Sequence, residues 1–420
     1  MSELKRTILY QAHLDAGATM VDFGGWDMPI QYPEGIIAEH LYCRRHCGIF
    51  DVSHMGRIDV EGPDQVAFLQ HVLSSNVLAL DLNQAQYCII PDANGYAIDD
   101  AYLYRFEEGK YFLVINAGNI DKDWAHLMNE AKNFDVKLTN VSDKYAAIAV
   151  QGPESKKILM TLSGGRQLTP ENVKNALNSL TMEGKPVRIA KTGYTGEPIG
   201  YELYCNSEDA RYFWDRLIEL GAKPTALGAR DTTRMEAALP LYGHEMGECE
   251  MGGEIQIYAV PLAKFAVSFD EAKGDFIGRE PLKKQFEALK KIMNRDYSSI
   301  EDLPYRIQPI YLEGKGVLRK GFPIYCKDAW AEGKQIGYVT SGTMIPYYKT
   351  EGQGLESVFT DETGKRSIGL AYMDSRICQD FDIEIDIRGR RQPAKVVGYH
   401  IRQDAAPYVR PILPDVKIET

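Results

Sequence analysis

The chain has 420 residues, of which 44% are hydrophobic and 25% are charged, and its formal net charge is −11. This composition is typical of a globular protein with two or three domains, and the acidic charge argues against non-specific binding to nucleic acid. No segment is long and apolar enough to cross a membrane, and the amino-terminus lacks the apolar core of a secretion signal. The seven cysteines have irregular spacing, which predicts no disulfide framework and a cytoplasmic location.

A group of metal-ligand residue types occurs in the first predicted helix, at His40, Cys43, His46 and Cys47. On a helix, His46 falls off the face that the other three residues share. No second cluster of cysteine and histidine completes a zinc site. We therefore predict no metal site and interpret these residues as partly buried positions of a helix.

The next segment, 50–56, contains Asp51, Ser53 and His54, which are the residue types of a hydrolytic triad. The members of such a triad come from separate elements that converge, and the chain has no Gly-x-Ser-x-Gly nucleophile elbow. We therefore interpret this segment as a structural turn that makes one or two contacts with a ligand.

Two segments share one plan, in which a strand leads through a Gly-Pro turn into an amphipathic helix. The first covers 58–73 and contains Gly62-Pro63, and the second covers 147–162 and contains Gly152-Pro153. Proline is common at the first helical position, so we expect each helix to begin at its proline. The repeat predicts an internal duplication of β–turn–α units. Either helix N-terminus could also hold an anion, an alternative that the sequence leaves open.

Two adjacent carboxylates, Asp99 and Asp100, follow a predicted hairpin turn at Asn94-Gly95. With the period-two alternation of a strand, Asp100 shares one face with Tyr102 and Tyr104, whereas Asp99 lies on the other face. A carboxylate among tyrosines can stabilise developing positive charge or hold a substrate amine where water is largely excluded. The alternative is that either carboxylate caps a turn or pairs with a lysine.

The segment 191–197 interrupts two predicted strands and places Tyr194 between two glycines, where its ring could stack on a flat ligand. Glu202 follows on the next strand. A glutamate that faces a pocket is the usual partner of an amidine-like pair of donors, such as a 2-amino-pyrimidinone edge. The alternative is an ordinary hairpin with an exposed glutamate.

The segment 228–234 is predicted to open a further helix, with Asp231 as its N-cap. Arg230 would then lie just outside the helix, where it could meet a carboxylate. A structural ion pair is the alternative.

The last part of the chain changes in character after a charged helix predicted at 280–294. Short strands separated by Gly and Pro are predicted at 307–312, 321–326, 335–340, 367–373, 381–387 and 394–398. Their regular spacing indicates an all-β domain, either a sandwich or a barrel. The polar, Gly-rich stretch 347–364 is interpreted as a surface excursion, and 411–420 as a tail.

In this order the motifs resemble the aminomethyltransferase, or T-protein, family of the glycine cleavage system, from about residue 9 to residue 397. The matching segments are Met20-Val-Asp-Phe-Gly-Gly-Trp-Asp-Met-Pro29, 50–56, 98–100, 114–118, 150–153, 191–197, 227–231, 241–244, 274–280, 339–342 and 367–372. The resemblance implies an α+β fold with three domains in a clover-leaf. A folate-binding region of two intertwined α+β domains with internal duplication would cover 1–278, an all-β barrel or jelly-roll-like domain 279–410, and a tail 411–420.

The resemblance also implies an activity. The enzyme would transfer the methylene of the aminomethyl group on lipoylated H-protein to tetrahydrofolate as co-substrate, with release of ammonia and without a metal. Segments 245–257 and 347–364 depart from the family pattern, so a tetrahydrofolate-dependent demethylase of a small methylated molecule is the alternative. A non-catalytic iron–sulfur assembly relative is disfavoured, because Lys191-Thr-Gly-Tyr194 lacks the cysteine of that group.

Site residues follow from the same resemblance. By motif position, Asp100 corresponds to the catalytic acid of the family, near the folate nitrogens. Glu202 corresponds to the pterin-binding glutamate and Arg230 to the folate-contacting arginine. The positions that line the channel in the family are Tyr87, Met55, Tyr104, Asn116 and Tyr194.

Overall fold

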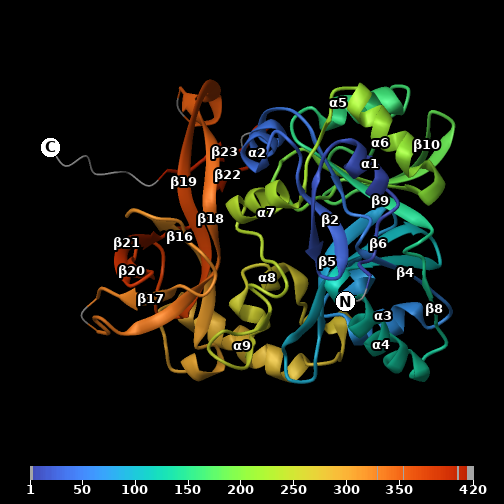
Figure 1. The fold of residues 1–420 in the computed structure, drawn as a ribbon. Coiled ribbons are helices and arrows are strands. Elements are labelled where there is room, and N and C mark those ends of the chain that lie inside the picture. Colours follow the sequence, from blue (N-terminus) through green and yellow to red (C-terminus); the bar gives the residue numbers. More distant parts are fainter. Residues whose placement is uncertain (1–2, 329, 353, 404–405, 414–420) are drawn as a thin grey trace.

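The amino-terminal part of the molecule contains two sheets that are built on the same plan (Figure 1). The computed structural model describes residues 3–328, 330–352, 354–403 and 406–413. The first sheet has, in spatial order, β5 (Gln84–Pro91), β6 (Ala97–Glu107), β7 (Lys110–Ile115), β4 (Gly56–Glu61) and β8 (Lys137–Asn140). The second has β10 (Leu177–Met182), β11 (Lys185–Ala190), β12 (Gly200–Asn206), β9 (Tyr145–Gln151), β3 (Gly48–Asp51) and β13 (Lys223–Pro224).

Each sheet arises from the same sequence of elements. One strand, β4 or β9, passes through a helix into an antiparallel meander of three strands, and the last strand of the meander pairs with that first strand. The helices are α3 (Gln65–Val72) and α5 (Ser155–Leu162). The predicted internal duplication is therefore confirmed.

The turn before each helix differs in one detail from the prediction. Gly62 and Gly152 have φ angles of 126° and 119°, which favour glycine. A Cβ atom at Gly152 would lie 2.4 Å from the carbonyl oxygen of His46, so the chain needs glycine for this close approach. The helices begin two residues after each proline, because the chain completes a turn first. In the second turn, the Glu154 N–H donates to the His46 carbonyl, which favours a turn over an anion site.

An apolar layer joins the two sheets and supports the residues that the sequence singled out. Its buried members from different strands are Phe50, Tyr104, Phe112, Ala149 and Tyr204. Met55 and Tyr102 are only partly buried and pack against the margin of this layer. The packing of one sheet on the other therefore fixes the positions of site candidates from both copies.

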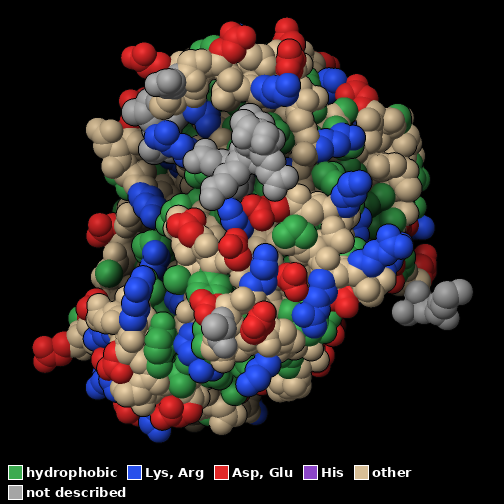
Figure 2. Space-filling view, turned by 90° about the vertical axis from the view of Figure 1, so that its left-hand side faces the viewer, with side chains coloured by type: hydrophobic (Ala, Val, Ile, Leu, Met, Phe, Trp, Pro, Cys, Tyr) green, Lys and Arg blue, Asp and Glu red, His purple; other side chains and the backbone are tan. Residues whose placement is uncertain are grey.

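The carboxy-terminal part forms a closed barrel, as predicted. Its strands, in spatial order, are β16 (Tyr305–Leu312), β19 (Val358–Asp374), β18 (Gln335–Glu351), β17 (Pro323–Cys326), β20 (Asp382–Ile387) and β21 (Arg390–Val396). Closure pairs the edges of the sheet and leaves an apolar interior that includes Ile310, Val339 and Ile383. Figure 2 shows Lys and Arg side chains intermingled with Asp and Glu on the face of the molecule that carries the barrel.

Strands β18 and β19 are longer than predicted, because 347–364 continues both of them as one hairpin. Tyr348 pairs with Thr363 and Glu351 with Val358. Most of its described residues are exposed, so the predicted surface excursion is confirmed, and it has the form of a two-stranded hairpin. The hairpin reaches helix α2 (Ile36–Arg45), where Arg45 forms an ion pair of 2.8 Å with Asp361 (Figure 1).

Helix α7 (Leu227–Glu236) lies where the barrel meets the amino-terminal units (Figure 1). It contacts α2, β18, β19 and β2 (Trp26–Gln31). The other helices are α1 (Tyr10–Asp15), α4 (Ile120–Glu130), α6 (Ala210–Glu219), α8 (Ala263–Ala266) and α9 (Arg279–Met293). The other strands are β1 (Thr19–Phe23), β14 (Gly247–Glu248), β15 (Glu254–Ile255), β22 (Ile401–Arg402) and β23 (Arg410–Pro411). The α+β class is confirmed.

The predicted domain limits remain predictions. Phe276 and Leu282, on either side of the limit at 278, belong to one apolar cluster that also contains Tyr372 of the barrel. Most of the predicted tail, 414–420, lies outside the described residues. All seven cysteines are free thiols, which agrees with the absence of a disulfide framework. Within the described ranges, no helix is long and apolar enough to cross a membrane.

Candidate active site

Asp100 lies on β6, and two donors hold its carboxylate. The Tyr87 hydroxyl donates to Oδ2 at 2.9 Å, and the Asn116 amide donates to Oδ1 at 2.8 Å. Asp100 and Tyr102 are partly exposed, whereas Asp99 and Ala101, on the opposite face of the strand, are buried, as the alternation predicted. Burial and the negative charge of Asp99 raise the pKa of Asp100 to about 7, although its two donors act in the opposite direction. A carboxyl group of this kind can exchange its proton near neutral pH.

Asp99 supports Asp100 from the buried side of the strand. Its carboxylate accepts the backbone N–H of Asn116 at 3.0 Å, the Asn116 amide at 2.8 Å and the Asn119 amide at 2.7 Å. The positive end of the dipole of α4, which starts one residue after Asn119, also favours a negative charge nearby. Asn116 thus links both carboxylates, and the sequence analysis missed Asn119.

Glu202 lies on β12 of the second copy and is held by hydroxyl groups. Thr192 donates to Oε2 at 2.6 Å and Tyr104 donates to the same atom at 2.9 Å. Glu202 is partly buried, so it is not the exposed glutamate of an ordinary hairpin. The ring of Tyr104 is only 1% exposed, so this residue holds Glu202 and does not itself present a surface to a ligand.

Tyr102 lies close to both carboxylates. Burial is the main cause that raises the pKa of its hydroxyl, and the charges of both Glu202 and Asp100 add to this effect. A cavity of about 470 Å³ opens beside it and is also lined by Thr192, the donor to Glu202. Tyr102 of the first copy and Thr192 of the second both line this cavity, so it opens at the junction of the two copies, although neither carboxylate lines it directly.

The predicted start of the helix that carries Arg230 is wrong. The helix α7 begins at Leu227, so Arg230 is inside it and Asp231 is not its N-cap. The N-cap is Ala226, whose backbone N–H donates to the Glu39 carboxylate at 2.8 Å. Asp231 instead accepts a hydrogen bond from Arg234 in the next turn.

Arg230 presents a free donor to the site. Its guanidinium lies 5.8 Å from the centre of the Phe50 ring, and its buried Nη1 has no hydrogen-bond partner among the residues that the structure describes. Burial lowers the pKa of Arg230, and the nearby charge of Glu202 opposes this effect. An unpaired buried guanidinium nitrogen is suited to a carbonyl or carboxylate oxygen of a ligand.

Tyr194 and Met55 lie at the margin of the same site. Tyr194 is partly exposed, and its hydroxyl donates to the carbonyl of Pro240. Burial raises the pKa of Tyr194, and the next cause is the negative charge of Asp100, so the two side chains are neighbours. Met55 packs on the apolar layer between the sheets.

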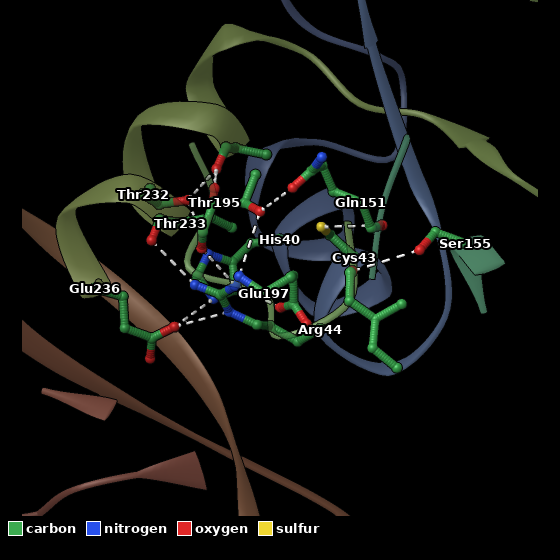
Figure 3. A network of polar contacts seen from close by, with 12 residues as sticks. His40, Cys43, Arg44, Gln151, Ser155, Thr195, Glu197, Thr232, Thr233 and Glu236 are labelled. Atoms are coloured by element: carbon green, nitrogen blue, oxygen red, sulfur yellow. Dashed lines mark hydrogen bonds and ion pairs between the residues drawn. The ribbon is translucent and has the colours of Figure 1, made fainter. Parts of the chain in front are cut away.

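A buried ion network ties the Tyr194 loop to the rest of the molecule (Figure 3). Arg44 of α2 donates to Glu236 at 2.9 Å, to Glu197 and to the carbonyl of Thr195 at 2.8 Å. On the barrel side, Arg366 donates to Glu236 at 2.7 Å. The side chains of Arg44, Glu197 and Glu236 are at most 3% exposed. The sequence analysis missed Arg44, because its partners are distant in the chain.

The other chemistry-bearing segments have structural roles. Asp51 accepts a hydrogen bond from Thr7 at 2.6 Å and contacts His13 at 3.0 Å, while the His54 ring packs edge-on against Phe23. They form no triad. In the part of the chain that the structure describes, no three His, Cys, Asp or Glu side chains are grouped so that they could hold a metal.

Comparisons with known proteins agree on one family. A family model described as the GCVT N-terminal domain matches residues 9–258. The aminomethyltransferase of Deinococcus deserti is 39% identical over 394 residues, which cover 93% of this chain and 95% of that protein. The chain belongs to the aminomethyltransferase family. The aminomethyltransferase of Caldanaerobacter subterraneus is 37% identical over 401 residues, which cover 94% of this chain and 95% of the relative.

A solved aminomethyltransferase has the same fold. The crystal structure of glycine cleavage system aminomethyltransferase T from Bartonella henselae matches with a TM-score of 0.73 and 27% sequence identity. The match covers 94% of this chain and 97% of that one. The resemblance, the enzyme class and the role in glycine cleavage that the sequence indicated are thus confirmed. The aminomethyltransferase relatives favour this function over the demethylase alternative.

Proposed function

We propose that this aminomethyltransferase binds tetrahydrofolate between the two copies of the duplicated unit and transfers to it the methylene of aminomethyl-lipoyl H-protein. The single observation that carries this proposal is the pair of carboxylates, Asp100 on β6 of the first copy and Glu202 on β12 of the second, that lie close to one tyrosine, Tyr102. One is poised for proton exchange near neutral pH, and the other is oriented by hydroxyl donors. We also propose that the enzyme acts in the cytoplasm without a metal.

Glu202 and Arg230 fit the two kinds of polar group on a folate. The 2-amino-4-oxo edge of a pterin presents neighbouring N–H donors, which a single carboxylate can accept together. The hydroxyls of Thr192 and Tyr104 fix Glu202 for this contact. The unpaired Nη1 of Arg230 is complementary to an oxygen of the same ligand. Tetrahydrofolate would supply the amine that accepts the methylene.

Asp100 would stabilise positive charge that develops on the methylene during transfer. Its carboxylate is oriented in advance by Tyr87 and Asn116, so little reorganisation is needed when the charge appears. With a pKa of about 7, its charged form increases as the pH rises through neutrality. The same group can hold a proton at its Oδ atoms while ammonia leaves.

The proposal predicts a specific product from a specific donor. Purified enzyme mixed with aminomethyl-loaded lipoylated H-protein and tetrahydrofolate is expected to release ammonia and to form methylenetetrahydrofolate in equal amounts. Ammonia is measured by a coupled assay and the folate product by chromatography. Methyltetrahydrofolate formed from a small methylated donor would support the demethylase instead. No ammonia release with loaded H-protein would refute the proposal.

Glu202→Gln is expected to weaken tetrahydrofolate binding roughly 10- to 100-fold, because a hydrogen bond to a charged acceptor contributes more than one to a neutral amide. Calorimetric titration with tetrahydrofolate measures the dissociation constant. Glu208→Gln, on the exposed turn that follows the same strand, is the matched control and should bind as the wild type does. Equal affinity of Glu202→Gln and wild type would exclude Glu202 from pterin recognition.

A further inference from the structure

Asp123 of α4 is a buried carboxyl group without a role in the chemistry described above. Its exposed fraction is 0%, and neither of its oxygens accepts a hydrogen bond from a donor among the described residues. An ionised carboxylate in such a place would lack both water and donors, which is strongly unfavourable. The side chain is therefore expected to retain its proton and to need an acceptor.

Asp99 is that acceptor. Asn119 and Asp123 are four residues apart at the start of α4, so they lie on the same side of the helix, and the Asn119 amide donates to Asp99 at 2.7 Å. Asp99 therefore lies beside Asp123, and the two carboxyl groups interact. Two carboxylates in contact do not both ionise readily, and the donors decide which one carries the charge. Asp99 accepts three N–H bonds from Asn116 and Asn119, whereas Asp123 accepts none. The negative charge therefore belongs on Asp99 and the proton on Asp123.

The other charged and titratable groups around the pair do not change this assignment. Lys122, the neighbour on the same helix, donates to the carbonyl of Ile98 at 2.6 Å and to the hydroxyl of Tyr242 at 2.8 Å. The negative charge of Asp100 also opposes ionisation of Asp123. Burial first, and then the charge of Asp99, raise the pKa of Asp123 to about 10.

We propose that Asp123 is a permanently protonated positioning residue, which donates an O–H···O hydrogen bond to Asp99 and through Asn116 fixes the carboxylate of Asp100. The proton stays on Asp123 during the reaction, so Asp123 takes no part in proton transfer. The arrangement leaves one negative charge, not two, behind Asp100. This inference rests on the proposed role of Asp100 for its kinetic consequence but not for the protonation of Asp123.

Infrared difference spectroscopy tests the proton directly, without turnover. Wild type minus Asp123→Asn is expected to show the carbonyl stretch of a protonated carboxylic acid at neutral pH, and the band should shift in deuterium oxide. Asp121→Asn, on the exposed side of the same helical turn, is the control and should leave the band unchanged. Absence of the band would overturn the proposal. This test does not depend on the proposed function, because it measures the protonation of Asp123 and not the transfer of a methylene group.

Kinetics test the positioning role. Asp123→Asn keeps a neutral donor toward Asp99, so its kcat and the acid limb of its pH profile should match the wild type. Asp123→Leu removes the donor, so Asp99 repels charge on Asp100 more strongly, the acid limb moves to higher pH, and kcat at neutral pH falls about tenfold. Tetrahydrofolate affinity should stay the same in both variants. An acid limb that moves to lower pH in Asp123→Asn would show that Asp123 is ionised and would overturn the proposal.

Discussion

Asp100→Asn is expected to lower kcat for methylene transfer roughly 100- to 1,000-fold, which is the effect of removing one preorganised electrostatic contact from a developing charge. The substitution keeps the shape of the side chain and a partner for the Tyr87 hydroxyl, but it removes the negative charge. Single-turnover measurement with loaded H-protein separates this step from product release. Calorimetry should show that the variant still binds tetrahydrofolate, because Glu202 and Arg230 are unchanged.

The pH profile is the control for this prediction. Asp100 has a pKa raised from 3.8 to about 7, so its carboxylate form is lost as the pH falls through neutrality. Wild-type kcat should therefore rise with pH through about 7 and then level off, whereas the residual activity of Asp100→Asn should lack this limb. A limb that persists in the variant would assign the titration to another group. A loss of folate affinity as large as the loss of kcat would assign Asp100 to binding.

Arg44→Leu is expected to reduce the free energy of unfolding by about 3–5 kcal/mol, because it leaves two buried carboxylates without their shared cation. The two carboxylates are Glu197 and Glu236, and Arg366 remains as a partner for Glu236 only. Denaturant unfolding followed by fluorescence measures the change, provided that the slope with denaturant is the same in both proteins. Arg45→Leu is the matched control on the next residue.

The control differs from Arg44 in solvent exposure. Arg45 pairs with Asp361, whose side chain is 98% exposed, so its removal should reduce stability by less than about 1 kcal/mol. The pH dependence gives a second check. Without Arg44, the pKa of Glu197 in the folded state rises further above its unfolded value, so the variant loses stability as the pH rises. The deficit should be larger at about pH 8 than at about pH 5. Equal effects of the two substitutions would contradict a central role for this network.

Local sequence patterns were sufficient to predict the strands and the opposite orientation of Asp99 and Asp100. The alternation at 97–103 predicted that Asp99 and Asp100 lie on opposite faces, and the Gly/Pro spacing after 303 predicted a barrel or sandwich. Both signals depend only on neighbouring residues, since strand geometry alone sets which side each residue faces. The repeated β–turn–α plan was visible for the same reason.

The failures involve contacts between residues far apart in the chain. Asp231 has the residue type of an N-cap, but Glu39 satisfies the first backbone donor of the helix at Ala226 from 187 positions away. The partners of Arg44 lie about as far away, so no spacing rule could connect them. Polar composition predicted the surface excursion at 347–364, but it gave no signal for the mutual pairing of two strands that makes a hairpin there. Asp123 looks like an ordinary acidic residue near a helix start until its burial is known.

The duplicated plan separates two properties that most active sites combine in one segment. The carboxylate proposed for the reaction lies on the middle strand of the first meander, and the one proposed for ligand recognition lies on the last strand of the second. The two are therefore not at equivalent positions of the repeated plan. Mutations in β12 can therefore alter which ligand is accepted while the acid on β6 is inherited unchanged. A descendant could equally lose the acid and survive as a binding protein, with its architecture intact.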